Sequence, residues 1–236
     1  MTPTTPNRRR LLSMLAASPI VMTGVGVFPR DLRAQAEGAG LISPNVCMVM
    51  PETTAGPFYF DPDLERRDIT EDRTGEALDL AIQVVDAECA PVTGARVDVW
   101  HCDALGNYSG YARQGSDGAN DTSGETFLRG TQMADARGVA RFSTIYPGWY
   151  RGRATHIHYL IHLDERTVLT SQVFFPDALS NYLYMAVEPY STRDAARDTS
   201  NRQDRIARSV GAGGFAAVRE QSKGYEAQIV VGIDAG

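Results

Sequence analysis

The 236-residue chain has very little lysine: 22 of its 23 basic residues are arginines, and Lys223 is the exception. The formal net charge is −6 and the pI is near 5.2. A protein that binds nucleic acid through its phosphates needs a basic face, so this balance argues against a nucleic-acid partner. Hydrophobic residues make up 43% of the chain and charged residues 22%, a globular mixture that excludes wholesale disorder.

Long apolar runs are also scarce, and only residues 11–28 approach the length of a membrane span. This run lies at the N-terminus, which excludes a polytopic membrane protein. Gly24, Gly26 and Pro29 interrupt the apolar pattern or end it, and this favours a cleavable segment over a retained anchor. We therefore expect no stable membrane insertion after cleavage.

Residues 1–36 have the order of a cleavable export signal: a polar start, three arginines at positions 8–10, the apolar run, and small residues that end at Ala36. The cleavage is predicted after Ala36. Consecutive arginines followed by two leucines resemble a twin-arginine signal, a type that exports proteins already folded. We expect export to the periplasm or the medium, and a single catalytic domain over residues 37–236.

Three cysteines, Cys47, Cys89 and Cys102, follow this segment and would meet an oxidising compartment. No CxxC pair is present in the sequence, which argues against a zinc ribbon or a thioredoxin-like redox motif. We expect one disulfide and one free thiol, and the sequence leaves all three pairings open.

The dominant pattern of the remaining chain is a two-residue alternation of apolar and polar side chains, which is typical of half-buried strands. Strands are predicted at residues 78–84, 95–100, 138–145, 155–163, 168–175 and 228–233. Helical signals are weak and are confined to residues 178–186 and 198–209. Short strands separated by turns predict an all-β sandwich of mostly antiparallel strands with little helix. Residues 107–125 are rich in Gly, Ser, Asp and Asn and predict a long active-site loop.

The chain has four histidines, and three of them lie on one predicted strand: His156, His158 and His162. Residues two apart on a strand face the same side, so His156 and His158 can direct two imidazoles at one metal ion. Such a pair is also common on surfaces and in cores. His162 is interpreted as structural, and His101, at the end of an earlier strand, as structural or as a support for the site.

Tyrosines and arginines surround this pair. The stretch YPGWYRGRATHIH (146–158) joins an aromatic turn, two arginines and both histidines, and WHCDALGNYSGY (100–111) adds further tyrosines. Imidazoles combined with phenolates suit a hard, highly charged ion, whereas a thiolate-preferring metal would need cysteines spaced for it. A bound cation can hold a tyrosine deprotonated far below its usual pKa of about 10. Ferric iron fits this donor set best.

Four segments carry a specific pattern of two tyrosines and two histidines in a fixed order: PETTAGPFYF (51–60), VDVWHCDALGNYSGY (97–111), LRGTQMADARGVARFSTIYPGWYRGRATHIH (128–158) and SQVFFPD (171–177). In this order and context they resemble the intradiol ring-cleavage dioxygenases, the family that includes protocatechuate and catechol dioxygenases. The resemblance extends from about residue 47 to residue 177, and the chain beyond about residue 180 is not covered.

Four positions match the metal ligands of this family: Tyr108, Tyr150, His156 and His158. Tyr150 matches the ligand that substrate displaces. The resemblance therefore implies a mononuclear, non-haem Fe(III) site.

Further positions match residues around the substrate in the family: Arg153, Gln172, Gly56, Pro57 and Phe58. The last three match the N-terminal segment that walls the substrate site. The resemblance implies that Arg153 stabilises negative charge on the ring, and that Tyr150 and Gln172 act with it in catalysis.

The resemblance implies that a small aromatic diol, a catechol, is cleaved between its two hydroxyls, and that both atoms of O₂ enter a muconate-type diacid. Two other functions remain open from the residues. One is a different non-haem metalloenzyme that combines the HxH pair with a carboxylate. The other is an exported, non-catalytic β-sandwich module that binds an aromatic or carbohydrate ligand. Neither the preferred catechol nor the presence of a homo-oligomer follows from the sequence.

Overall fold

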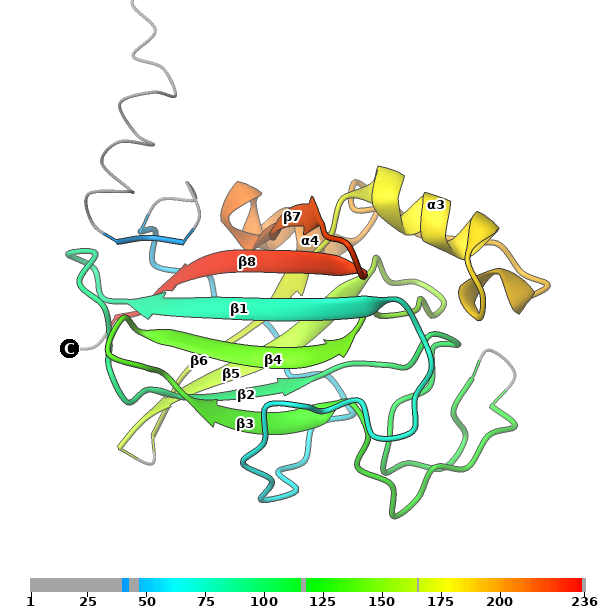
Figure 1. Cartoon of the computed structure of the whole chain (residues 1–236), viewed down its shortest axis with the longest axis horizontal. Helices are drawn as coiled ribbons and strands as arrows, with labels where there is room; N and C mark the ends of the chain where they lie inside the picture. The colour runs from blue at the N-terminus through cyan, green and yellow to red at the C-terminus, as the bar shows by residue number, and fades with distance from the viewer. Residues whose placement is uncertain (1–39, 43–46, 116–117, 165, 235–236) are drawn as a thin grey trace, which may run out of the picture.

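Two four-stranded sheets face each other in the computed structural model of the chain (Figure 1). The structure describes residues 40–42, 47–115, 118–164 and 166–234, so the predicted export signal at 1–36 lies outside the described residues. One sheet has the strand order β4-β1-β8-β7 and the other β3-β2-β5-β6. Neighbouring strands are antiparallel, except that β1 and β8 are parallel. The predicted all-β sandwich is confirmed.

The first sheet contains β1 (Ala77–Val85), β4 (Val139–Ile145), β7 (Ala217–Glu220) and β8 (Tyr225–Gly232). The second contains β2 (Arg96–Trp100), β3 (Arg129–Met133), β5 (His156–Leu163) and β6 (Arg166–Phe174). Between β6 and β7 lie α3 (Asp177–Ala186), η1 (Tyr190–Thr192), α4 (Arg205–Val210) and η2 (Ala212–Gly214). None of the helices in the described ranges is both long and apolar enough to cross a membrane.

The alternation of side chains decides which face of each strand enters the core. The core-facing residues of β1 are Leu78, Leu80, Ile82 and Val84. On β5, Ile157, Tyr159 and Ile161 enter the same core. Successive residues of a strand point to opposite faces, so His156 and His158 lie on the outer face of their sheet and not in the space between the sheets.

The sequence prediction missed β3 and β7, because both strands are defined by their partners. β3 has the sequence RGTQM, which shows no apolar alternation. Gly130 allows this strand to pack closely, since a Cβ there would lie only 2.6 Å from Ile69 Cγ2. β7 is four residues long and largely exposed, so its own pattern is too short to identify it. β3 is a strand because it pairs with β2, and β7 is a strand because it pairs with β8.

The helix predicted at residues 178–186 is confirmed by α3, but the helix predicted at 198–209 is wrong in its first half. Only Arg205–Val210 is helical there. The preceding residues use their polar groups for contacts with other segments. Asp198 accepts a hydrogen bond from the backbone N–H of Gly152 (3.0 Å), and the Asn201 side chain donates to the carbonyl oxygen of Phe175 (2.7 Å).

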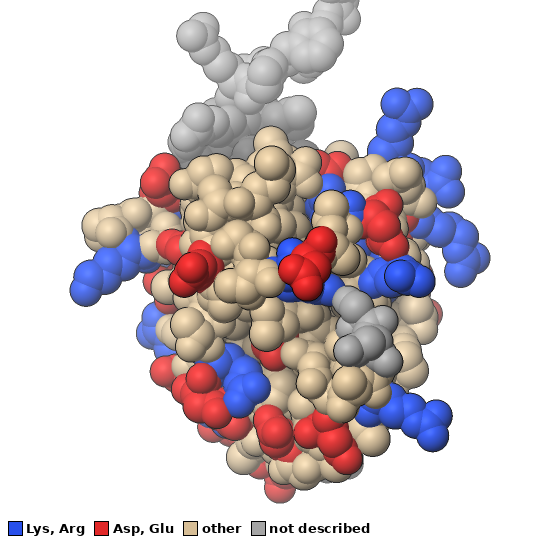
Figure 2. Space-filling model, turned by 90° about the vertical axis from the view of Figure 1, so that its right-hand side faces the viewer, with Lys and Arg blue, Asp and Glu red and all other residues tan. Residues whose placement is uncertain are grey.

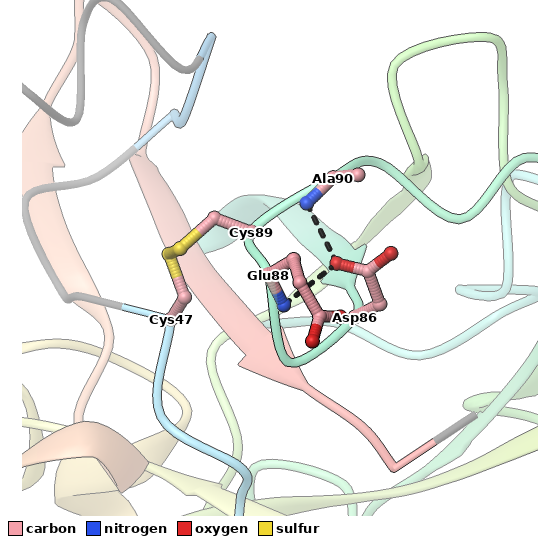
Figure 3. The surroundings of a disulfide bond; sticks show 5 residues. All are labelled: Cys47, Asp86, Glu88, Cys89 and Ala90. Carbon is pink, nitrogen blue, oxygen red and sulfur yellow. Dashed lines mark hydrogen bonds between the residues drawn. A yellow bond between two sulfur atoms is a disulfide. The ribbon is translucent and has the colours of Figure 1, made fainter. Parts of the chain in front are cut away.

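Cys47 and Cys89 form a disulfide, with their Cα atoms 5.3 Å apart (Figure 3). This settles the pairing that the sequence left open and leaves the third cysteine as a buried free thiol. Cys89 lies in the turn after β1. The Asp86 carboxylate shapes this turn by accepting hydrogen bonds from the backbone N–H groups of Glu88 (3.0 Å) and Ala90 (2.8 Å) (Figure 3).

The disulfide anchors residues 47–58, which we call the N-terminal strap. The backbone N–H of Met50 donates to Gly232 on β8 (2.8 Å), and that of Thr53 donates to Thr170 on β6 (2.7 Å). These bonds lead the strap from the first sheet to the second. Its last residues therefore reach the sheet that carries the paired histidines.

Replacing both Cys47 and Cys89 by serine should destabilise the protein by about 4 kcal/mol, because the disulfide spans a sequence separation of 42 residues and restricts the unfolded chain. The midpoint of thermal unfolding, followed by circular dichroism, should fall by about 10 °C. Cys102→Ala keeps the disulfide and is the control, with a clearly smaller expected loss. An unchanged midpoint in the double variant would mean that the backbone bonds of the strap suffice without the disulfide.

Candidate metal centre

His156 and His158 extend from the outer face of β5 toward a common point. Their Nε2 atoms are 3.1 Å apart, in agreement with the predicted same-face arrangement. The Nδ1 atom of His156 lies 2.7 Å from the carbonyl oxygen of Ala154, so we assign the proton to Nδ1 and a lone pair to Nε2. Trp100 stacks on His158, with ring centroids 4.8 Å apart and an angle of 11°, and this contact fixes the plane of the imidazole.

Tyr108 and Tyr150 bring two phenol oxygens to the same point. The Oη atom of Tyr150 lies 3.1 Å from Nε2 of His156, and the Oη atom of Tyr108 lies 3.4 Å from the same nitrogen. Tyr108 comes from the loop after β2, and Tyr150 comes from the connection between β4 and β5. We call Tyr108, Tyr150, His156 and His158 the donor cluster.

The long loop predicted at residues 107–125 holds Tyr108 by hydrogen bonds within its described part. The backbone N–H of Tyr108 donates to Oε1 of Gln114 (3.0 Å), and its carbonyl oxygen accepts from Oγ1 of Thr122 (2.6 Å). Phe58 stacks on the phenol ring, with centroids 4.7 Å apart. As a result Tyr108 is only 1% exposed, and the loop delivers one fixed oxygen to the cluster.

Burial keeps all four groups of the donor cluster neutral. Burial, with a smaller contribution from the charge of Arg153, lowers the pKa of His156 to about 3, and burial lowers the pKa of His158 well below its usual value. Burial raises the pKa of Tyr150 to about 12, although Arg153 opposes this, and it raises the pKa of Tyr108 well above 10. The phenols therefore release their protons only to a strongly charged cation.

The donor cluster fits such a cation in geometry and in chemistry. Ligand atoms about 2.0–2.1 Å from one ion at tetrahedral angles are about 3.3 Å apart, and the distances to His156 Nε2 are 3.1–3.4 Å. Two phenols and two imidazoles suit a hard ion. In the part of the chain that the structure describes, no group of three or more His, Cys, Asp and Glu side chains is placed to hold a metal. The described residues therefore place no carboxylate with His156 and His158, which the alternative metal site with an HxH pair would need.

Arg153 and Gln172 lie beside the donor cluster, as the sequence predicts. The Nη1 atom of Arg153 is 3.4 Å from both Tyr150 Oη and His156 Nε2. Its Nη2 atom donates to Oε1 of Gln172. Gln172 lies directly opposite His158 in the pairing of β5 with β6, so the register of these strands places both side chains on one face.

The N-terminal strap covers the donor cluster. Gly56 has a φ of +69°, and a Cβ there would lie 3.5 Å from Cε1 of His158, so the backbone passes directly over this imidazole. The Nε2 atom of Gln172 donates to the carbonyl oxygen of Thr54 (3.1 Å) and ties the strap to β6. Of the three residues predicted to wall the substrate site, Gly56 lies against His158 and Phe58 stacks on Tyr108. Pro57 is exposed, and no described contact joins it to the cluster.

Sequence reasoning missed Asp204, whose Oδ2 atom accepts a hydrogen bond from Nε of Arg153 (2.8 Å) across a sequence separation of 51 residues. Asp204 is 2% exposed. The local signal for this residue is that an aspartate directly precedes a short helix, where it is a favoured cap. Nothing in the sequence connects that cap with Arg153.

The other two histidines have partners of their own. The ring nitrogens of His101 lie 2.9 Å from the carbonyl oxygen of Cys102 and 2.8 Å from Oγ1 of Thr144, and burial lowers the pKa of His101 to about 4. His162 Nε2 lies 3.0 Å from the carboxylate of Asp98. These contacts support the structural interpretation of both histidines.

Charged side chains of both signs are interspersed on the face shown in Figure 2. A mixed surface of this kind produces no strong long-range field of one sign. At the donor cluster itself, Arg153 places a positive charge close by, with Nη1 3.4 Å from two of its atoms.

The chain is similar to known dioxygenases. A family model described as Dioxygenase matches residues 55–189, more than half of the chain. Catechol 1,2-dioxygenase of Pseudomonas sp. (strain EST1001) is 31% identical over 178 residues, which cover 65% of this chain and 52% of that protein. The chain spans about half the length of the curated relatives it matches.

Two solved structures share the fold. The intradiol ring-cleavage dioxygenase from Tetranychus urticae is 32% identical, with a TM-score of 0.72 over 80% of this chain and 95% of its own. The dioxygenase domain of a dioxygenase–carbohydrate-binding protein fusion from Streptomyces sp. SirexAA-E is 27% identical, with a TM-score of 0.59 over 80% of this chain and 100% of its own. The family match at residues 55–189 includes the whole donor cluster, and this chain belongs to the intradiol ring-cleavage dioxygenase family.

Proposed function

We propose that this protein is a ferric, non-haem intradiol dioxygenase that cleaves a catechol between its two hydroxyls and incorporates both atoms of O₂ to give a muconate-type diacid. The observation that carries the proposal is the donor cluster, in which two phenol oxygens and one imidazole nitrogen lie 3.1–3.4 Å from Nε2 of His156. Membership of the family supports the class of reaction.

The four residues of the donor cluster would hold one Fe(III). Bound there, the ion would chelate both oxygens of the catechol and make its ring reactive toward O₂. Tyr108, His156 and His158 are each no more than 2% exposed, so packing holds them in place. Tyr150 is only partly buried, and it is the member of the cluster with room to move when substrate binds.

Tyr150 is also placed to accept a proton from the substrate. A catechol must lose both hydroxyl protons before it binds a metal through two oxygens. Burial raises the pKa of Tyr150 to about 12 even though Arg153 opposes this shift, so a Tyr150 phenolate without a metal partner would take up a proton and keep it at neutral pH. Nη1 of Arg153, 3.4 Å from Tyr150 Oη, can steady this oxygen.

Arg153 supplies a fixed positive charge where the deprotonated ring would lie. A charged donor in a site with little water stabilises developing negative charge far more than it does in solution. Gln172 holds Nη2 of the guanidinium, and Phe58 shields the cluster by stacking on Tyr108. These residues would therefore orient the substrate and exclude water, and a bound ion would add the reactivity.

The visible spectrum of the purified protein tests the proposal. We expect a broad phenolate-to-iron charge-transfer band that moves to longer wavelength when catechol is added without oxygen, and consumption of O₂ when air is admitted. A colourless protein that iron cannot colour would contradict the proposal. In that case the metal content separates the alternatives: no stoichiometric metal favours a binding module, and a different bound metal favours another metalloenzyme.

Replacing Tyr150 by phenylalanine should weaken or shift the charge-transfer band, because one of the two phenolates is lost, while three residues still retain iron. Turnover should fall by at least about 100-fold, since the variant also lacks the proton acceptor. Absorption spectroscopy, metal analysis and O₂ uptake measure the three effects. Tyr111→Phe is the control, because Tyr111 donates to the backbone of Tyr59 (2.9 Å) and not to the cluster. An unchanged spectrum and unchanged turnover in Tyr150→Phe would reject this assignment.

We also propose that the protein is exported. Support comes from the order of charged, apolar and small residues in positions 1–36, and from the disulfide between Cys47 and Cys89, a bond that persists in oxidising compartments. Replacing Arg9 and Arg10 by lysine should retain the full chain inside the cell. Equal recovery of wild type and variant outside the cytoplasm would contradict the twin-arginine assignment.

A further inference from the structure

We propose that Asp204 is a positioning residue for catalysis: it holds the guanidinium of Arg153 in the orientation that aims one nitrogen at the donor cluster. This inference rests on the proposed ring-cleavage function, because that function assigns Arg153 its role. Asp204 lies outside residues 55–189, the part of the chain that the family model matches. The active site would thus depend on a segment beyond that match.

The three nitrogens of the Arg153 guanidinium have different partners. Nε donates to Oδ2 of Asp204 (2.8 Å), and Nη2 donates to Oε1 of Gln172. Nη1 is directed at Tyr150 Oη and His156 Nε2, at 3.4 Å from each. A planar guanidinium that is bonded at two nitrogens has little freedom to rotate, so the position of Nη1 is determined by Asp204 and Gln172 together.

The carboxylate of Asp204 is itself fixed on both sides. Oδ2 also accepts from the backbone N–H of Ala154 (2.8 Å), the residue after Arg153. Oδ1 accepts from the backbone N–H groups of Ile206 (2.7 Å) and Ala207 (3.2 Å) and so caps α4. One side chain therefore joins the start of a helix to the backbone and the side chain of the arginine segment.

Packing places this helix against the site. Ala207 and Val210 of α4 form a buried cluster with Ala154 and with Phe174, the last residue of β6. Phe174 lies opposite His156 in the pairing of β5 with β6. The helix that carries the Asp204 cap is therefore packed against the end of β6 and the segment that leads into β5, the strand that carries the two histidines of the donor cluster, and its position is coupled to theirs.

The ionised form of Asp204 is favoured in this place. Burial raises the pKa of the carboxyl, but the Ala154 N–H and the charge of Arg153 outweigh it, and the pKa lies below its ordinary value. Ion pairs in which both partners are also hydrogen-bonded fix orientation as well as charge. A side chain with a single acceptor oxygen cannot both cap α4 and accept from Nε of Arg153, so loss of the second oxygen would let Nη1 move away from the cluster.

The variant Asp204→Asn keeps the helix cap, because asparagine caps a helix about as well as aspartate, but it turns an NH₂ group, which cannot accept, toward Nε of Arg153 and the N–H of Ala154. We expect iron content and the spectrum without substrate to stay close to wild type. The midpoint of thermal unfolding should fall by only a few degrees, because the buried N–H of Ala154 loses its acceptor. Turnover should fall about 10- to 100-fold, as expected for a misplaced catalytic group. Anaerobic titration with catechol, followed by the shift of the charge-transfer band, should show affinity changed less than about 3-fold.

Two further variants complete the test. Asp198→Asn is the matched control, because Asp198 is exposed and accepts from Gly152 N–H in the same segment without contacting Arg153; its turnover should stay within about 3-fold of wild type. In a double-mutant cycle, adding Asp204→Asn to Arg153→Ala should cause no further loss of turnover, because a residue that acts through Arg153 has nothing left to position.

The outcomes separate the two proposals. Wild-type protein that consumes no O₂ with catechols would overturn the proposed function, and the role of Asp204 with it. An active wild type combined with a fully active Asp204→Asn overturns only the positioning role. A variant that loses iron in proportion to turnover, or whose thermal midpoint falls by much more than a few degrees, also overturns it, because Asp204 would then act on the fold. A double variant that is much slower than Arg153→Ala also overturns the positioning role.

Discussion

Replacing His156 by alanine should weaken iron binding by at least about 100-fold, because outer partners of metal ligands already contribute about 10–100-fold and His156 is placed as a ligand itself. Its Nε2 atom lies within 3.1–3.4 Å of both phenol oxygens and of His158 Nε2. Removal of this nitrogen leaves two phenols that burial keeps protonated beside a single imidazole. Metal analysis after dialysis, and titration of metal-free protein with iron, measure the loss.

His162→Ala is the matched control for this experiment. His162 lies on the same strand as His156, an even number of residues further along. It nevertheless contacts Asp98 (3.0 Å) and Thr167 (3.1 Å) and not the donor cluster. We expect its iron content and turnover to remain close to wild type. Full iron occupancy in the His156 variant, or equal iron loss in both variants, would contradict the assigned donor set.

Replacing Arg153 by alanine should lower kcat by about 100- to 1,000-fold, equivalent to about 3–4 kcal/mol, the effect expected when one preorganised charged donor is removed from a transition state. The four residues of the donor cluster stay in place, so iron content and the spectrum without substrate should change little. Metal analysis and steady-state O₂ uptake with catechol distinguish the two effects. Turnover close to wild type would exclude Arg153 from the mechanism.

Arg151→Ala is the control for charge alone. Arg151 is exposed and only two residues away, so its removal changes the net charge equally but does not affect the guanidinium beside Tyr150. Arg153→Lys retains a positive charge but cannot bond Asp204, Gln172 and the cluster at once. We expect its turnover to lie between those of wild type and the alanine variant. Equal losses in the Arg151 and Arg153 variants would indicate a general electrostatic effect.

The strands that the sequence predicted well are those whose alternation is local. A strand expected at residues 78–84 is observed at Ala77–Val85, and one expected at 155–163 is observed at His156–Leu163. The two-residue period fixes which side chains share a face, before any partner strand is known. The shared face of His156 and His158 follows from this period alone.

The relative positions of side chains in the site depend on pairing between distant segments. The position of Gln172 opposite His158 follows from the register of β6 on β5. The stacking of Trp100 on His158 follows from the pairing of β2 with β5. β3, with its RGTQM sequence, is a strand because β2 offers an edge. In each case the side chains lack a local pattern that identifies their neighbours.

The all-β class, the shared face of the paired histidines and the nearness of Tyr150, six residues before His156, follow from the sequence alone, because they depend on side-chain period and on residues close together in the chain. Tyr108, 48 residues from His156, is assigned only through the resemblance to the family.

The pairing of Cys47 with Cys89 and the hydrogen bond between Asp204 and Arg153 emerge only in the folded chain. The partners in these contacts are 42 and 51 residues apart, and their approach is set by the packing of the strap and of α4 against the completed sheets, which no local pattern encodes.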